Sequence, residues 1–412
     1  MIRRVRLENF RSFMEADIDL GWFTVLLGPN SAGKSNLFYG LATLGRVADH
    51  PLLAPSRRPG AAAGGPTRFL KTQRAVPEEP TFPTGSEAVP FDQVVRGGDQ
   101  TLAVRLMVEL ERDDARGAYD VQFGRYRQDV LILEERLQWE DAEYSARFDS
   151  REDVLRAVKG QETRMWAVPR AQSAPFLLYH FRLEPESAPL APAAVRLREA
   201  LRLARYRFDP WGIKRPAEPG IQMRPNGYGL GSKLDDLQAD RARFAELEQA
   251  FRSFFPNFEQ IVIPSPREGV KQLAVVEQGH TMPADCISDG ALLCLAILYL
   301  VFDPDPPPLI CLEEPENGLH PHLLHELVSL LRRVSQGEVG PKQTQILVST
   351  HSPEFLRWCE PSEVYLVERT SEGTQFQRWP AQFGKEELSS RYRMAMSDAW
   401  LSGAVGGVPV EG

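Results

Sequence analysis

The feature that most constrains this chain is a short stretch near its start, Gly28-Pro29-Asn30-Ser31-Ala32-Gly33-Lys34-Ser35, which matches the pattern G-x-x-x-x-G-K-S in full. Residues 23–27 before it form an apolar run typical of a strand buried on both faces, and residues 36–44 after it have helical composition. A strand, this turn and a helix are the context that a phosphate-binding loop requires. The pattern therefore predicts a nucleotide-binding α/β domain, because a glycine-rich turn and a helix N-terminus both present N–H groups to phosphate.

Two side chains of this stretch are expected to touch the nucleotide and its metal ion. Lys34 would reach the β- and γ-phosphates, and the hydroxyl of Ser35 would bind Mg²⁺. The alternative is a plain glycine turn, which the flanking strand and helix patterns disfavour.

A pair of acidic residues lies far along the chain from this loop. Residues 309–312 form a short apolar run typical of a buried strand, and Glu313 and Glu314 follow it directly. A carboxylate at such a strand end can hold Mg²⁺ opposite the phosphate loop, and its neighbour can act as general base on the attacking water. Two acids at a strand end are usually only solvated, but beside a phosphate loop in one parallel sheet they predict a catalytic site.

The composition bounds the class of protein. The chain has 412 residues, is 42% hydrophobic and 25% charged, and carries a net charge of −8, which excludes wholesale disorder and disfavours a wholly basic nucleic-acid binder. Its longest apolar run, residues 291–302, is too short to span a membrane and predicts a buried helix, and the N-terminal residues lack the apolar stretch of a secretory signal. The cysteines form no C-x-x-C pair, so we expect reduced thiols in a cytoplasmic protein, with neither disulfides nor a zinc site: Cys286, Cys294, Cys311 and Cys359.

Composition shifts divide the chain into stretches of different character. Strand and helix patterns alternate over residues 1–47 and again from 259 onward, which predicts a mainly parallel α/β sheet. Residues 48–100 are rich in Pro, Gly and Ala and indicate loops, whereas residues 101–150 return to strand patterns. No heptad pattern is sustained, so a long coiled-coil arm is not expected.

Two helices are expected in the middle of the chain. The first has an apolar stripe and an arginine face; the stripe is Leu197, Leu201, Ala204 and Phe208, and the arginines are Arg198, Arg202 and Arg205. Such a face can bind nucleic-acid phosphate, but charged faces are more often solvated, and we favour the solvated interpretation. The second helix is expected to start at Ser232, with Asp235 completing a pattern similar to a capping box.

Five segments together resemble the ABC-type ATPase heads of the SMC/RecF/OLD-like group, and they occur in that group's order. Residues 7–13 resemble its N-terminal strand motif, 28–36 its Walker A motif, 288–290 its signature motif, 312–321 its Walker B motif and D-loop, and 349–353 its switch histidine. The spacing also fits, because Ser288 lies 25 residues before Glu313 and His351 lies 37 residues after Glu314. The resemblance covers residues 1–47 and 259–370, and the combination of motifs is very specific.

The resemblance implies a P-loop ABC-ATPase head with a mixed, largely parallel sheet and an α+β insertion. The head would comprise residues 1–47 and 259–412, and residues 48–258 would form a lid or arm. It also implies binding and hydrolysis of ATP with Mg²⁺, with Glu314 and His351 in catalysis and Ser35 and Glu313 at the metal. The implied nucleotide-binding residues are Asn30, Ser31, Ala32, Gly33, Lys34, Ser35, Asn36 and Arg11, joined by Ser288 and Gly290 from a second copy of the chain.

The sequence departs from the group's pattern at several points. Glu313 stands where the group has aspartate, and no glutamine can be assigned to the Q-loop. Little more than a strand and a helix is expected after His351, so we expect an AAA family ATPase without the C-terminal TOPRIM nuclease domain of OLD proteins. A metal cluster built from His320, His322, His325 and Glu316 is disfavoured, because these helical offsets spread around the axis instead of facing one ion.

These features lead to two hypotheses for function. The first is a homodimeric or higher-order ATPase in nucleic-acid-linked repair or anti-phage defence, working with a separately encoded nuclease or effector. The second is a nucleotide-gated protein scaffold with slow ATP turnover and no DNA role. A transporter motor is less supported, since neither a membrane segment nor a coupling Q-loop is recognised. A small-molecule P-loop kinase is disfavoured by Ser288 and His351 at these positions.

Overall fold

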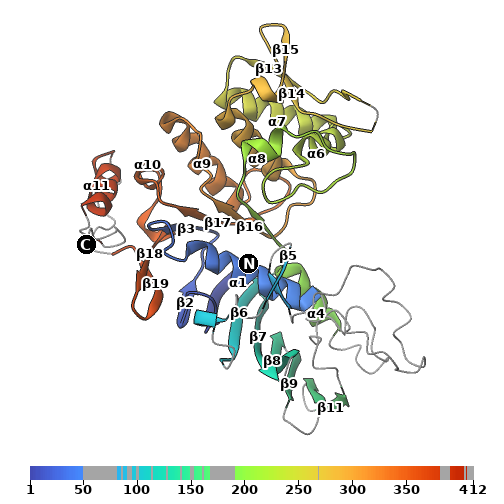
Figure 1. Cartoon of the computed structure of the whole chain (residues 1–412), viewed down its shortest axis with the longest axis vertical. Coiled ribbons are helices and arrows are strands. Elements are labelled where there is room, and N and C mark those ends of the chain that lie inside the picture. Colours follow the sequence, from blue (N-terminus) through green and yellow to red (C-terminus); the bar gives the residue numbers. More distant parts are fainter. Residues whose placement is uncertain are drawn as a thin grey trace. The chain divides into compact units, whose positions relative to one another are not determined.

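A computed structural model describes most of the chain as two compact units. The described residues are 1–49, 81–84, 87–90, 95–98, 102–112, 115–126, 129–139, 142–148, 153–159, 162–167, 191–267, 269–380, 390–402 and 405. The P-loop unit contains Met1, Leu20–Phe38 and Arg202–Gly412, and the sheet unit contains Ile2–Asp19 and Tyr39–Leu201. These boundaries differ from those expected from composition, because the first two strands group with the middle of the chain and residues 202–258 group with the P-loop (Figure 1).

The P-loop unit is built on a six-stranded sheet in the order β12-β16-β17-β3-β18-β19. The first five strands are parallel to their neighbours and β19 is antiparallel, so the expected mixed, largely parallel sheet is confirmed. Parallel strands end at the same edge, and ligands of open α/β sheets bind at that carboxyl edge. The bounds are β12 Leu203–Tyr206, β16 Leu309–Glu313, β17 Gln345–Thr350, β3 Phe23–Leu27, β18 Val364–Thr370 and β19 Gly373–Arg378.

Helices cover this sheet and enclose the main hydrophobic core. The helix α8 (Asp289–Phe302) is buried at every position from Gly290 to Phe302, as its apolar sequence predicted, and Ser288 caps its N-terminus. The helix α9 (Leu324–Ser335) packs on β17 and β3 with its apolar face. The other helical elements of the P-loop unit are α10 (Pro353–Leu356), α11 (Ser390–Leu401), η5 (Pro321–Leu323), η6 (Pro361–Glu363) and the first turns of α1 (Lys34–Asp49).

A second group of elements in the P-loop unit packs around α8. The helices α5 (Pro210–Lys214), α6 (Leu230–Leu237) and α7 (Arg241–Phe254) each contact α8. A three-stranded antiparallel sheet follows, formed by β13 (Phe258–Val262), β14 (Ala274–Glu277) and β15 (His280–Pro283), with η4 (Ala284–Cys286) leading into α8.

The prediction of one helix starting at Ser232 was wrong, since the structure has two helices there. Ser232 lies fully buried inside α6, whose N-cap is Gly229. The helix α6 ends at Leu237. The side chain of Asp240 then caps α7 by accepting a hydrogen bond of 3.2 Å from the Arg243 amide. A side-chain cap of this kind begins a new helix instead of extending the old one.

The prediction of one helix running through residues 197–208 was also wrong. The helix α4 (Ala191–Ala200) ends early, and residues 203–206 form the parallel edge strand β12 beside β16. The pairing of Arg205 with Cys311 and of Tyr206 with Leu312 in the sheet overrides the local helical pattern. The three arginines therefore do not share a helix face: Arg202 pairs with Asp305 at 2.5 Å, and Arg205 extends from the strand.

The sheet unit contains an eight-stranded antiparallel sheet in the order β11-β10-β9-β8-β7-β6-β1-β2. The strand patterns expected over residues 101–150 are confirmed. Of the loops expected in residues 48–100, most lie outside the described residues; the described part contains the pair β4 (Thr81–Thr84) and β5 (Glu87–Pro90) and the short helix η3 (Arg96–Gly98). The sheet strands are β1 Ile2–Glu8, β2 Glu15–Asp19, β6 Val104–Arg112, β7 Ala115–Tyr126, β8 Asp129–Trp139, β9 Ala142–Phe148, β10 Asp153–Lys159 and β11 Glu162–Ala167.

All four cysteines carry free thiols. Cys294, Cys311 and Cys359 are buried, and burial raises the pKa of each thiol above its usual range, whereas Cys286 is exposed. Within the part of the chain that the structure describes, the helices are too short or too polar to cross a membrane.

Candidate active site

The glycine-rich loop is held rigidly at the carboxyl edge of the P-loop sheet. The amide of Gly28 donates to the Thr350 carbonyl at the end of β17 (3.3 Å), and the Thr374 hydroxyl donates to the Ala32 carbonyl (2.7 Å). A Cβ on Gly28 would lie 2.2 Å from the Val367 carbonyl oxygen, so only glycine fits between the loop and β18. Gly33 adopts a positive φ of 107°, a backbone conformation that only glycine reaches without strain.

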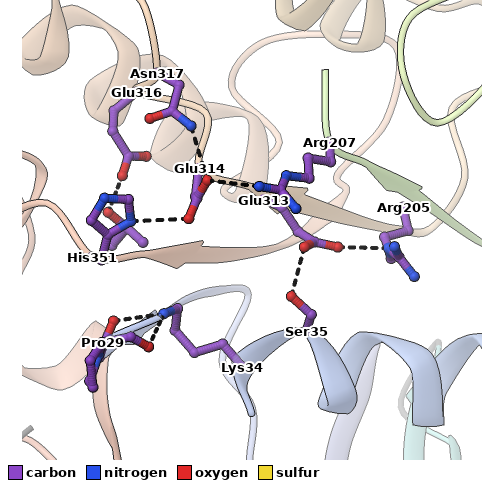
Figure 2. A network of polar contacts seen from close by, with 12 residues as sticks. Pro29, Lys34, Ser35, Arg205, Arg207, Glu313, Glu314, Glu316, Asn317 and His351 are labelled. Atoms are coloured by element: carbon purple, nitrogen blue, oxygen red, sulfur yellow. Dashed lines mark hydrogen bonds and ion pairs between the residues drawn. The ribbon is translucent and has the colours of Figure 1, made fainter. Parts of the chain in front are cut away.

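Lys34 points back into this loop. Its Nζ atom donates hydrogen bonds to the carbonyl oxygens of Gly28 (2.6 Å) and Pro29 (2.8 Å), as Figure 2 shows. The residue is 7% exposed, and burial lowers the pKa of its ammonium group, partly opposed by the nearby acidic side chains. An ammonium group held among loop backbone atoms is placed to bind phosphate oxygens.

The hydroxyl of Ser35 meets the first acid of the pair. Ser35 Oγ donates to Glu313 Oε2 at 2.7 Å, and the other carboxylate oxygen forms an ion pair with Arg205 at 2.7 Å. Because Mg²⁺ prefers oxygen ligands and is usually held by one or two protein oxygens together with substrate phosphates, these two residues fit a magnesium ion. Among the described residues, no three or more His, Cys, Asp or Glu side chains are grouped so that they could hold a metal ion by themselves.

Glu314 lies at the centre of a polar network (Figure 2). One carboxylate oxygen lies 3.0 Å from His351 Nδ1, and the other accepts a hydrogen bond of 3.0 Å from the Asn317 amide. The guanidinium of Arg207 lies 3.5 Å from that second oxygen. The backbone of Glu314 has a positive φ of 49°, held by a hydrogen bond of 2.8 Å from its amide to the Ser349 carbonyl. Such strained backbone is typical of functional sites.

Glu316 is a buried acid that the sequence did not single out for this site. It accepts a hydrogen bond from the hydroxyl of Thr350, and that hydroxyl oxygen accepts one from the Ser352 amide at 2.9 Å. Burial is the main cause that raises the pKa of Glu316 to about 7, and the neighbouring charge of Glu314 adds to the effect. The signal in the sequence was its position three residues after Glu313, inside the acidic motif.

The signature residues occupy a different part of the P-loop unit. Ser288 accepts a hydrogen bond of 3.3 Å from the Ala291 amide, and a Cβ on Gly290 would lie 2.3 Å from the Gly318 carbonyl oxygen. The signature segment at Gly290 and the segment at Gly318 therefore pack backbone against backbone. They line a hollow of about 210 Å³ with Phe254, Phe255, Leu319, His320, His322 and Leu323.

The remaining predicted residues are placed as follows. Asn30 and Ser31 are exposed in the loop, Ala32 is buried, and the amide of Asn36 donates to the Gly33 carbonyl at 3.0 Å. Arg11 belongs to the sheet unit, where its guanidinium lies 4.0 Å from the ring centre of Tyr39. Its contact with phosphate stays a prediction.

The four residues of the disfavoured metal cluster have other neighbours. His320 and His322 approach each other with their Nδ1 atoms 2.7 Å apart, and the His325 ring packs against Trp358 at 4.6 Å. Glu316 turns instead toward Thr350.

Sequence reasoning missed two arginines of this site. Arg205 and Arg207 contact Glu313 and Glu314 because residues 203–206 form β12 at the edge of the sheet. No local pattern distinguishes them from the arginines of a helical face, and only the strand pairing brings them to the acids.

Comparison with known proteins identifies the family. A family profile described as "AAA domain, putative AbiEii toxin, Type IV TA system" matches residues 23–357. The chain belongs to this family. The AAA-domain match spans the phosphate loop, the acidic pair and His351, and with the order of strands it confirms the expected P-loop ABC-type ATPase fold. A search of the curated proteins finds no match.

Several solved structures are similar at low identity. An SMC head bound to the C-terminal winged-helix domain of ScpA is 15% identical, with 91% of this chain and 97% of that chain covered and a TM-score of 0.47. The SMC head domain from Thermotoga maritima is 13% identical, with 92% and 98% covered and a TM-score of 0.41. A Pyrococcus furiosus SMC head with an extended coiled coil, bound to the C-terminal domain of ScpA, is 12% identical, with 91% and 95% covered and a TM-score of 0.43.

Proposed function

We propose that this protein binds ATP with Mg²⁺ and hydrolyses the β–γ phosphoanhydride. The observation that carries the proposal is the approach of His351 to Glu314 at 3.0 Å, at the same sheet edge as Lys34 and the Ser35–Glu313 pair. A general base, its orienting partner, a phosphate-binding lysine and a metal-binding pair are the parts that phosphoryl transfer requires.

The chemical step uses side chains that are already in contact. Water attacks the γ-phosphorus, and Glu314 accepts the proton of that water while His351 and Asn317 hold its carboxylate. The bond between the γ-phosphorus and the bridging oxygen breaks, and ADP leaves with the bonding electrons. Lys34 stabilises the charge on the phosphates.

The metal would be held by Ser35 and Glu313. When bound there, Mg²⁺ would neutralise the negative charge that develops on the phosphate oxygens. The Ser35 hydroxyl and the Glu313 carboxylate, 2.7 Å apart, each offer an oxygen toward the loop.

We further infer that two copies of the chain assemble around ATP. Ser288 and Gly290 would then contact the γ-phosphate held by the P-loop of the other copy, as the resemblance to SMC/RecF/OLD-like heads implies. The N-terminus of the buried helix α8, which is 14 residues long, supports this role because its N–H groups and dipole favour an anion.

The experiment that tests the proposal measures phosphate release and assembly together. Wild-type protein should release phosphate from ATP, and Glu314→Gln should bind ATP, fail to hydrolyse it and elute as a dimer on gel filtration. As a matched control, the exposed Glu246→Gln should behave as wild type. Absence of both turnover and ATP binding in wild-type protein rejects the function, and a strictly monomeric Glu314→Gln protein with ATP rejects the dimer.

The biological role that we propose is anti-phage defence or nucleic-acid repair in the cytoplasm, with a separately encoded effector or nuclease. The family description, which names a toxin–antitoxin system, supports defence. DNA should stimulate turnover, and a nuclease or effector should co-purify with the Glu314→Gln form.

A second candidate is a nucleotide-gated scaffold with slow turnover and no DNA role. It is favoured by Glu313, which stands where the resembled group has aspartate, because the extra methylene keeps the charge but changes the position of the carboxylate. Slow ATP hydrolysis at a rate that DNA does not change would support this second candidate.

A further inference from the structure

The edge strand β12 carries two arginines toward the catalytic carboxylates. Arg205 is opposite Cys311 in the parallel register with β16, so Arg207, two residues on, lies level with Glu313. Alternate residues of an extended chain point to the same side, and both guanidinium groups therefore reach the carboxyl edge of the sheet (Figure 2).

Arg205 and Arg207 differ in how firmly they are held. The side chain of Arg205 is 21% exposed and forms a close ion pair with Glu313 at 2.7 Å. The side chain of Arg207 is 67% exposed and lies 3.5 Å from Glu314, a distance beyond a normal hydrogen bond. An exposed ion pair of this kind contributes little to stability, so its guanidinium can exchange partners at low cost.

The backbone around Arg207 is fixed although its side chain is exposed. Its amide donates to the Pro225 carbonyl at 3.0 Å. On either side, the rings of Tyr206 and Phe208 stack with centroids 5.1 Å apart. A guanidinium on a fixed stem, beside the general base and with its outer face open to solvent, is placed to reach a phosphate group that arrives at Glu314.

We propose that Arg207 is a sensor of the terminal phosphate that acts within its own chain. It leaves Glu314 when ATP binds and contacts the γ-phosphate oxygens, with which guanidinium forms strong charge-assisted hydrogen bonds. Glu314 keeps His351 and Asn317 and can then hold the attacking water. Arg205 is a positioning residue, because it fixes Glu313 beside Ser35. This inference rests on the proposed binding of ATP.

The test compares affinities for ATP and ADP by isothermal titration calorimetry in the Glu314→Gln background, in which ATP persists. Arg207→Ala should weaken ATP binding about tenfold to a hundredfold, the range expected for hydrogen bonds to a charged group, and change ADP binding less than twofold. Arg207→Lys should restore part of the loss. The exposed Arg267→Ala is the matched control and should change neither affinity.

The outcomes separate this inference from the proposed function. Equal weakening of ATP and ADP would show a structural role for Arg207, and unchanged binding of both would show a role as a surface counter-ion; either result overturns the inference while ATP binding stands. Failure of the parent protein to bind ATP rejects the proposed function itself. Arg205→Ala should keep the ratio of ATP to ADP affinity and raise the Mg²⁺ concentration needed for ATP binding.

Discussion

Ser35 Oγ and Glu313 Oε2 lie 2.7 Å apart, although 278 positions separate the two residues in the chain. Ser35 stands in the first turn of α1, which follows β3, and Glu313 ends β16; β17 lies between these strands. The contact exists because parallel strands bring their carboxyl ends to one edge. This hydrogen bond between a hydroxyl and a carboxylate oxygen joins the phosphate loop to the acidic pair.

Removing the charge of Glu313 should weaken the response to magnesium. In Glu313→Gln the shape of the side chain and its contact with Ser35 are kept, but the amide is a poorer ligand for a hard cation. The Mg²⁺ concentration that gives half-maximal ATP binding should rise about tenfold or more. Titration of Mg²⁺ at fixed ATP measures it, with Glu246→Gln as control, and an unchanged midpoint would place the metal elsewhere.

Replacing Lys34 should affect both nucleotides. Lys34→Met removes the ammonium group that the loop carbonyls of Gly28 and Pro29 now hold, while it keeps an unbranched apolar stem. Affinity for both ATP and ADP should fall about tenfold to a hundredfold, in contrast to the selective loss expected for Arg207→Ala.

Equilibrium binding of a fluorescent nucleotide measures the effect of Lys34→Met. Lys342→Met removes an exposed ammonium paired with Asp305 and serves as the control, which should bind as wild type does. Normal ADP binding by Lys34→Met would contradict the role of Lys34 at the β-phosphate.

Much of the candidate site could be predicted because its residues lie in short continuous motifs at the ends of strands. The phosphate loop follows β3, the acidic pair begins at the last residue of β16 and His351 follows β17, so each motif marks a strand end as well as a proposed function. Once the strands were expected to be parallel, their meeting at one edge followed from topology. The buried helix α8 was predictable for a similar reason, since its sequence is apolar on every side.

The arginines of β12 could not be predicted in the same way. Residues 197–208 satisfy a helical pattern, and only pairing with β16 turns residues 203–206 into a strand that carries Arg205 and Arg207 to the acids. Glu316 lies within the acidic motif, but its contact with Thr350 depends on the pairing of β17 with β16, which the local sequence does not indicate. In both cases the position of the side chain depends on strand pairing between distant segments, which local sequence periodicity does not predict.

The buried Glu316 should make stability depend on pH. Burial raises its pKa to about 7 from an ordinary value of 4.5, so between these values the folded state binds a proton that the unfolded state has lost. This contribution to stability is fully present below pH 4.5 and disappears as the pH rises through about 7. The shift corresponds to a change of about 3 kcal/mol in the free energy of unfolding.

Urea unfolding of wild type and Glu316→Gln at pH 5 and pH 8 measures this effect. The amide can still accept a hydrogen bond from Thr350 but does not titrate, so wild type should lose stability relative to Glu316→Gln as the pH rises. Glu314 and Lys34 face the same group with opposite charges and are unchanged in both proteins. The control Glu246→Gln should follow wild type, and parallel pH profiles for wild type and Glu316→Gln would disprove the buried-acid interpretation.

The signature residues offer a test of assembly that is separate from nucleotide binding. Ser288→Ala removes the cap of α8 and should cost about 1 kcal/mol of stability, since the rest of the helix is buried. In the Glu314→Gln background it should bind ATP normally yet form much less dimer, because in the proposed dimer this hydroxyl contacts the ATP held by the other copy. Gel filtration with ATP measures the dimer, and Ser253→Ala, which removes a hydroxyl bonded to the Ala250 carbonyl, is the control. A Ser288→Ala protein that dimerises as its parent does would exclude this hydroxyl from the contact. Gly290→Ala should lose more stability, because its Cβ would lie 2.3 Å from the Gly318 carbonyl oxygen and force the two motifs apart.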